Sequence, residues 1–68
     1  MLGKERCKEI RQKTGLSQKY FAQLMRTKRG TIASYEGGKR SPCASSTLRY
    51  IKIAFELGIE LTSDELEI

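Results

Sequence analysis

Charged residues dominate the start of the chain, and the few apolar residues among them recur at helical spacing. Cys7 and Ile10 lie three positions apart between Lys4 and Thr14, and Gly15 follows this segment. An apolar stripe of this period is typical of a surface helix, and a glycine commonly ends such a helix. The pattern predicts a first helix from Lys4 to Thr14.

A second helix is predicted to begin after Ser17, because serine is a favourable N-cap. Leu16 and Phe21 occupy the two positions of a hydrophobic staple around this cap. We expect Phe21, Ala22 and Met25 to share the buried face of this helix.

A very short break at residues 26–27 separates this helix from a third, which is predicted over residues 28–36. Ile32 and Tyr35 would point inward, and the glycines at 37–38 would end the helix.

A fourth helix follows the loop at residues 37–44. It would begin at Ser45 or Ser46 and end at Leu57, with Gly58 beyond it. Its apolar residues recur every three positions and are expected in the core: Leu48, Ile51, Ala54 and Leu57.

The Thr-Ser-Asp-Glu segment at residues 62–65 has the spacing of a capping box, and Leu61 and Leu66 flank it. A final helical turn is therefore predicted here. No segment shows the alternation of a strand. We expect an all-α fold, a compact five-helix bundle that forms one domain over residues 1–68.

The charge is distributed unevenly along this sequence. Residues 1–40 contain eleven Lys or Arg and three Glu, a balance of +8, whereas residues 41–68 contain two Lys or Arg and five Asp or Glu, a balance of −3. A basic half opposite an acidic half orients a protein on a polyanion, which favours a nucleic-acid partner. The competing interpretation is a solvated surface that is lopsided without function.

The composition gives little support to a metal, cofactor or enzyme function. The chain has no histidine, and its two cysteines are too few for a disulfide framework. We expect both to be reduced, with Cys7 in the core and Cys43 in a loop. A cysteine nucleophile would lack a histidine base, and a domain of 68 residues leaves no room for a deep cleft. We expect no catalytic activity, no metal and no cofactor.

The chain contains no run of about 18 apolar residues, and its first residues lack the apolar core of a signal peptide. We expect a soluble cytoplasmic protein that does not enter a membrane.

Two short helices joined by a tight turn, here 17–25 and 28–36, are suited to reading the major groove of DNA. That groove admits one α-helix, and its base edges display a distinct pattern of donors and acceptors. The first helix of the pair braces the second and directs its own N-terminus at a phosphate.

The chain resembles the lambda-repressor/Cro-like (XRE) helix-turn-helix family over roughly residues 6–66. The resemblance implies a lambda-repressor-like bundle whose second and third helices form the helix-turn-helix. The residues that carry it are Ile10-Arg11, Leu16-Ser17-Gln18, Phe21-Ala22, Met25, Ile32, Tyr35-Glu36, Gly38-Lys39 and Pro42, followed by Leu48, Ile51, Ala54, Leu57, Gly58 and Ile59.

The outward face of the third helix is expected to read bases with Lys28, Arg29, Thr31 and Ser34. Arg29 can pair bidentately with guanine, and the hydroxyls of Thr31 and Ser34 can reach bases or phosphates. The alternative is a plainly solvated face.

Phosphate contacts are expected from two other segments. The Gln18 amide lies at the N-terminus of the second helix, where the helix dipole favours an anion, and Lys19 follows it. Lys39, Arg40 and Ser41 come after the reading helix and would clamp the DNA backbone.

The family resemblance also implies a structural ion pair. An arginine of the first helix typically pairs with the glutamate that ends the third, and these residues are Arg11 and Glu36 here. Both fall on core-facing edges, so we interpret them as a partly buried pair that fixes the reading helix and does not contact DNA.

The chain departs from the family pattern around the turn. Arg26 stands where glycine is usual, and Lys28 stands where Ser or Thr opens the reading helix. A positive φ at a non-glycine residue costs about 1 kcal/mol, so the turn is either strained or differently shaped. Thr27 could cap the helix one residue early, and Gly30 offers no side chain where a polar reader is common.

The predicted function is a sequence-specific transcriptional regulator, a repressor, that reads duplex DNA with helix 28–36 on a palindromic operator. Apolar residues that the core does not use would form a homodimer interface. These residues are Tyr50, Ile53, Ile59 and Leu61. Alternatively, the final helical turn folds back and covers them within one chain. The alternative is a protein-interaction module on the same fold, such as an antitoxin that binds a toxin, with DNA binding secondary.

Overall fold

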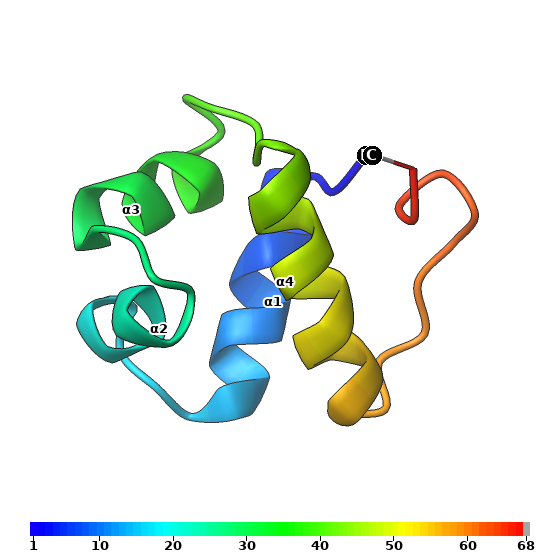
Figure 1. Cartoon of the computed structure of the whole chain (residues 1–68), viewed down its shortest axis with the longest axis horizontal. Helices are drawn as coiled ribbons and strands as arrows, with labels where there is room; N and C mark the ends of the chain where they lie inside the picture. Colours follow the sequence, from blue (N-terminus) through cyan, green and yellow to red (C-terminus); the bar gives the residue numbers. More distant parts are fainter. Residues whose placement is uncertain (68) are drawn as a thin grey trace.

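The computed structural model describes residues 1–67 and arranges them in four α-helices: α1 (Lys4–Thr14), α2 (Gln18–Leu24), α3 (Arg29–Gly37) and α4 (Ala44–Glu56). Figure 1 shows α1 and α4 side by side at the centre, with α2 and α3 on one flank and the segment after α4 returning along the other. No strand occurs among residues 1–67, and the predicted all-α fold is confirmed.

The fifth predicted helix does not form. Its capping box is present: the Thr62 amide donates to Glu65 Oε1 at 2.9 Å, and the Glu65 amide donates to Thr62 Oγ1 at 3.2 Å. The predicted final turn follows this cap at residues 63–66, where the Leu66 amide donates to the Thr62 carbonyl at 3.1 Å, but it is not extended into a helix. A first turn fixes several backbone dihedral angles for one hydrogen bond, so it needs further turns to become a stable helix. The predicted helix count is therefore wrong.

The helix ends largely follow the predicted signals. The Ser17 hydroxyl accepts a hydrogen bond from the Tyr20 amide at 3.3 Å, which confirms the N-cap of α2. α3 begins one residue later than predicted, because Lys28 has extended backbone angles (φ −93°, ψ 150°) and is itself the N-cap. α4 begins earlier than predicted, at Ala44, with Cys43 as its N-cap.

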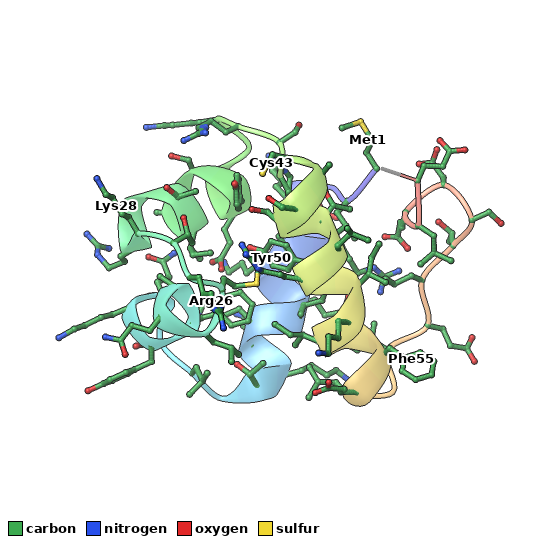
Figure 2. The ribbon with its side chains drawn as sticks, in the orientation of Figure 1. Met1, Arg26, Lys28, Cys43, Tyr50 and Phe55 are labelled. Carbon is green, nitrogen blue, oxygen red and sulfur yellow. The ribbon has the colours of Figure 1, made fainter. Side chains whose placement is uncertain are left out.

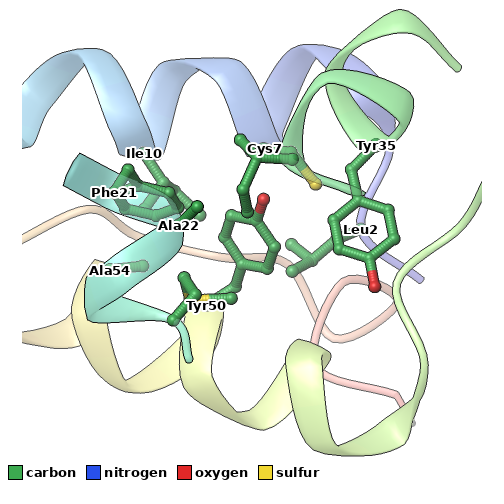
Figure 3. Close-up of a cluster of buried hydrophobic side chains, with 10 residues drawn as sticks. Leu2, Cys7, Ile10, Phe21, Ala22, Tyr35, Tyr50 and Ala54 are labelled. Carbon is green, nitrogen blue, oxygen red and sulfur yellow. The ribbon is translucent and has the colours of Figure 1, made fainter. Parts of the chain in front are cut away.

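The core is built around Tyr50, whose side chain is fully buried. Its ring centroid lies 5.6 Å from that of Phe21 and 6.2 Å from that of Tyr35, and its hydroxyl points toward Cys7 on α1 (Figure 3). Burial raises the pKa of the Cys7 thiol to about 11, so this thiol stays protonated and packs as a small apolar group, as predicted. The other buried apolar residues are Leu2, Ile10, Ala22, Met25, Ile32 and Ala54.

The buried face of α4 differs from the predicted one. Leu48 is 53% exposed and Leu57 is 37% exposed, whereas Thr47, Tyr50 and Ala54 are buried. Steps of three residues drift around a helix by about 60° each, whereas alternating steps of three and four stay on one face. Of the four residues predicted for this stripe, Ala54 is buried as predicted, whereas Ile51 is half-buried and Leu48 and Leu57 are exposed. The uniform three-residue spacing is therefore wrong.

The burial of Tyr50 also contradicts its predicted place in a homodimer interface, because a fully buried side chain cannot contact a second chain. The other three predicted interface residues, Ile53, Ile59 and Leu61, are half-buried and pack against the core.

The segment after α4 folds back and is tied to α1. Arg6 Nε donates to Glu65 Oε2 at 2.7 Å, and Arg6 Nη2 donates to Glu65 Oε1 at 3.1 Å. This contact lowers the pKa of the Glu65 carboxyl. The N-terminal ammonium of Met1 also donates to the Asp64 carbonyl. The C-terminal segment therefore folds back within the same chain, which is the alternative to the predicted homodimer interface.

The turn between α2 and α3 keeps a tight geometry although it lacks glycine. Arg26 adopts a left-handed conformation with φ 58°, and the Thr27 amide donates back to α2 at 2.9 Å. Arg49 Nη1, from α4, donates to the Met25 carbonyl at 3.2 Å and so binds the C-terminal end of α2. The sequence predicts a turn that is either strained or differently shaped. The left-handed conformation of Arg26 shows that it is strained.

We expect Arg26→Gly to stabilise the protein. The left-handed region costs a non-glycine residue about 1–2 kcal/mol, and glycine loses about 0.5–1 kcal/mol more backbone entropy on folding. The difference predicts a gain of about 0–1.5 kcal/mol, and each kcal/mol gained should raise Tm by about 4–8 °C. Thermal unfolding followed by circular dichroism measures this shift. Gln23→Gly, within α2, is the matched control and should lower Tm. A Tm that falls for Arg26→Gly as far as it does for Gln23→Gly would show that the turn stores no strain.

Candidate nucleic-acid interface

The outward face of α3 has small residues at its centre and larger polar residues at its edges. Gly30, Ala33 and Gly37 recur at three- and four-residue spacing, and a Cβ added at either glycine would meet open space. We call these three residues the smooth strip. Because it carries almost no side-chain atoms, the helix backbone can approach another surface closely there. The predicted base-reading residues are all exposed or half-buried. Arg29 and Ser34 lie on either side of the strip, Thr31 lies one helical step beyond Ser34, and Lys28 is the N-cap of the helix.

The predicted phosphate-binding residues lie on the two flanks of α3 (Figure 1). Gln18 and Lys19 open α2 on one flank, and residues 39–41, all exposed, lie in the loop on the other. Gly38 has φ 78°, and the Lys39 amide donates to the Ser34 carbonyl at 2.9 Å, which fixes the direction of this loop. The sugar-phosphate backbones of DNA border a major groove on both sides, so residues on both flanks of α3 are placed to face them if α3 enters the groove.

Arg11 and Glu36 form the predicted ion pair, and it is bidentate. Arg11 Nε lies 2.6 Å from Glu36 Oε2, and Nη2 lies 3.1 Å from Oε1. The two side chains are only 15% and 5% exposed. Arg11 Nη1 also donates to the Leu16 carbonyl at 3.1 Å. Hydrogen bonding to Glu36 raises the pKa of Arg11, which stays charged. The pair joins α1 and the loop after it to the end of α3.

Gln18 connects this ion pair to the reading face. Its Nε2 donates to Glu36 Oε1 at 3.2 Å, and its Oε1 accepts from Arg29 Nη1 at 3.4 Å. The sequence predicts a phosphate contact for Gln18 but not these contacts within the fold. The three residues lie in two helices that meet only through tertiary packing, so no local pattern signals them.

Cys43 is exposed at the start of α4, directly after the loop that carries residues 39–41. Hydrogen bonds with the side chains of Ser45 and then Ser46 lower the pKa of the Cys43 thiol to about 6. Over residues 1–67, no group of three or more His, Cys, Asp or Glu side chains is placed to hold a metal ion.

Comparison with known proteins points to DNA recognition. A family model described as Helix-turn-helix matches residues 8–44, which contain most of α1, both α2 and α3, and the loop after them. No curated protein and no solved structure matches the chain. In the part of the chain that the structure describes, no helix has the length and apolar character needed to cross a membrane.

We expect Arg11→Ala to destabilise the fold by about 1–3 kcal/mol, because it leaves the largely buried Glu36 carboxylate without its countercharge. Each kcal/mol lost should lower Tm by about 4–8 °C. Lys8→Ala, at an exposed position of the same helix, is the control and should change Tm little. The double variant Arg11→Ala/Glu36→Gln should recover part of the loss, since it removes the buried charge. The pairing would carry no stability if Arg11→Ala melted like the parent.

Proposed function

The chain belongs to the XRE/Cro/C1-type helix-turn-helix family, and on this premise we propose that it is a transcriptional repressor that binds duplex DNA sequence-specifically. The observation that carries the proposal is the outward face of α3, whose smooth strip begins beside the exposed cation Lys28 (Figure 2). Polar and basic segments flank this face on both sides, as the two walls of a major groove require.

In this proposal α3 enters the major groove and reads base edges with its first turns. Arg29 donates two hydrogen bonds to a guanine, and Lys28 contacts the adjoining base or phosphate. The hydroxyls of Thr31 and Ser34, which lie on the same side of the strip, contact bases or phosphates. Ala33, at the centre, offers a methyl group suited to packing on a thymine methyl.

Phosphate contacts fix the position of α3 in the groove but carry no sequence information. We assign them to Gln18 and Lys19 on one wall and to Lys39, Arg40 and Ser41 on the other. The balance of +8 over residues 1–40 supports this assignment, because it concentrates positive charge in the half that contains the helix-turn-helix.

We further propose that a homodimer binds a palindromic operator. One short helix reads only a few base pairs, and two copies related by a two-fold axis read both halves of a palindrome. Occupation of the operator would then repress transcription by excluding other proteins from that DNA.

Binding to duplex DNA should weaken steeply as salt rises, because phosphate contacts release condensed cations. Each contact contributes a slope of about −0.9 to log K against log salt concentration. Lys19, Lys39 and Arg40 therefore predict a slope of about −3 per copy. Fluorescence anisotropy with a labelled duplex, from about 50 to 200 mM salt, measures the slope. An affinity that stays flat over this range would exclude the DNA-binding proposal.

Arg29→Ala should reduce discrimination between operator and random duplex by about 1–3 kcal/mol, because it removes a bidentate base contact. Lys39→Ala is the matched comparison and should weaken binding to both duplexes by the same factor, since it removes a phosphate contact. An operator selected from a randomised duplex pool supplies the specific target. Arg29 is not a base reader if its replacement weakens both duplexes equally.

A further inference from the structure

A groove between α2 and α4 is lined mainly by cationic side chains. It has a volume of about 300 Å³. Three of its lining residues are cationic, two are apolar and one is acidic: Arg26, Arg49, Lys52, Leu24, Ile53 and Glu56. The ion pairs found among residues 1–67 involve none of these charged residues. The groove therefore has a charge balance of +2, which favours an anionic ligand.

Two segments that are distant in the sequence bring these cations together. Arg26 lies in the turn after α2, whereas Arg49 and Lys52 lie three residues apart on α4 and so share a face of that helix. Figure 2 shows Arg26 on the side of α2 that faces α4, and Lys28 at the outer end of α3. The groove is therefore separate from the proposed DNA-reading face.

The backbone of Arg26 indicates a role for its side chain. Its φ of 58° lies in the left-handed region, which costs any residue other than glycine free energy. A glycine would adopt the same turn without that cost. Arg26 takes part in none of the ion pairs among residues 1–67, so no such pair offsets the strain. Strained backbone residues cluster at functional sites, and the strain therefore favours a ligand for this guanidinium.

The cations suit a phosphoryl group. Arg49 Nη1 donates to the Met25 carbonyl at 3.2 Å, which fixes this guanidinium at the C-terminal end of α2. A guanidinium has five N–H donors in a planar fork that matches phosphate geometry, so Arg49 can bind the carbonyl and a ligand together. A phosphomonoester carries a charge of about −1.5 to −2 at pH 7, which matches the charge balance of the groove.

Apolar side chains extend the groove beyond its cations. Leu24 is 53% exposed on α2, and the half-buried Ile53 lines the same groove from α4. Covering this apolar surface with an apolar part of a ligand would be favourable. A volume of about 300 Å³ lies at the small end of the range for ligand pockets in proteins. The groove therefore suits a small molecule that combines a charged group with an apolar body.

We propose that the groove between α2 and α4 binds a small phosphomonoester. Its phosphoryl group lies among Arg26, Arg49 and Lys52. Its apolar body packs against Leu24 and Ile53. Binding neutralises cations that line one groove and links the α2–α3 turn to α4, so it should also stabilise the folded protein. The inference is independent of the proposed DNA binding, since it uses neither the outward face of α3 nor the residues assigned to DNA phosphates.

The first test compares three probes: phenyl phosphate, inorganic phosphate and phenol. Isothermal titration calorimetry should show binding of phenyl phosphate, at least about threefold weaker binding of inorganic phosphate, which lacks the apolar body, and no binding of phenol, which lacks the charge. Phenyl phosphate should also raise Tm. The inference is overturned if phenyl phosphate does not bind at millimolar concentration, or if inorganic phosphate binds as tightly.

Charge variants locate the site. Arg26→Gly and Lys52→Gln should each weaken the binding of phenyl phosphate at least about tenfold, because each removes a cation from the groove. Lys8→Gln, at an exposed position of α1, is the control and should bind like the parent. Arg26→Gly is expected to relieve backbone strain, so its loss of binding would not reflect unfolding. Parental binding in either groove variant would place the phosphate elsewhere and overturn the inference.

Leu24→Ser tests the apolar part of the site. It should weaken the binding of phenyl phosphate and leave that of inorganic phosphate unchanged. Leu48→Ser is the matched control, because Leu48 on α4 is also 53% exposed but does not line the groove, and it should change neither. The proposed ligand class is wrong if Leu24→Ser binds phenyl phosphate like the parent.

DNA is the other source of phosphate groups. Lys52→Gln should bind a duplex with the parental affinity and salt dependence, whereas Lys39→Ala should reduce the salt slope by about 1. If Lys52→Gln reduced the slope by the same amount, the groove would contact the DNA backbone and the small-molecule site would be overturned. A protein that bound phenyl phosphate but no duplex would support this site and overturn the proposed function.

Discussion

The bidentate contact between Arg11 and Glu36 is the constraint on which the position of α3 depends. α3 has nine residues, and its buried apolar anchors are Ile32 and Tyr35. So short a helix needs its ends held if it is to keep a fixed angle to the rest of the domain. Glu36 holds the C-terminal end, because its carboxylate accepts hydrogen bonds from both Arg11 and Gln18. These charge-assisted hydrogen bonds offset the cost of burying the carboxylate and are specific in direction, which apolar packing is not.

The same network separates the charges that position α3 from those that attract DNA. Arg11 is neutralised by a carboxylate within the fold, whereas Lys28 and Lys39 remain exposed at either end of α3. Exposed cations act over about a Debye length and favour approach to any polyanion. They cannot select a sequence by themselves. Selection requires donors held at fixed positions, and Arg29, which we propose as a base reader, is linked to the buried pair through Gln18.

Features set by local patterns could be predicted from the sequence, and features set by packing could not. The extent of α1, the Ser17 cap and the all-α class follow from periodicity and capping chemistry. The pairing of Arg11 with Glu36 came from family resemblance, since the two residues lie on separate helices. The register of α4 was missed, because buried polar residues such as Thr47 look exposed in a sequence. The contact of Arg49 with Met25 spans 24 positions and has no local signal.

The polar and apolar residues of α4 are distributed in a way that core formation alone does not explain. Its first turn buries Ser46 and Thr47, whose hydroxyls lie 3.3 Å from Tyr35 Oη and 3.4 Å from the Pro42 carbonyl. These hydrogen bonds satisfy the buried polar groups, and the one between Ser46 and Tyr35 links α4 to α3. The larger apolar side chain of Phe55 is left in solvent at the other end of the helix. Burying it would recover about 25 cal/mol per Å² of apolar surface. α1 covers the inner side of α4, so within residues 1–67 this ring gains no such burial.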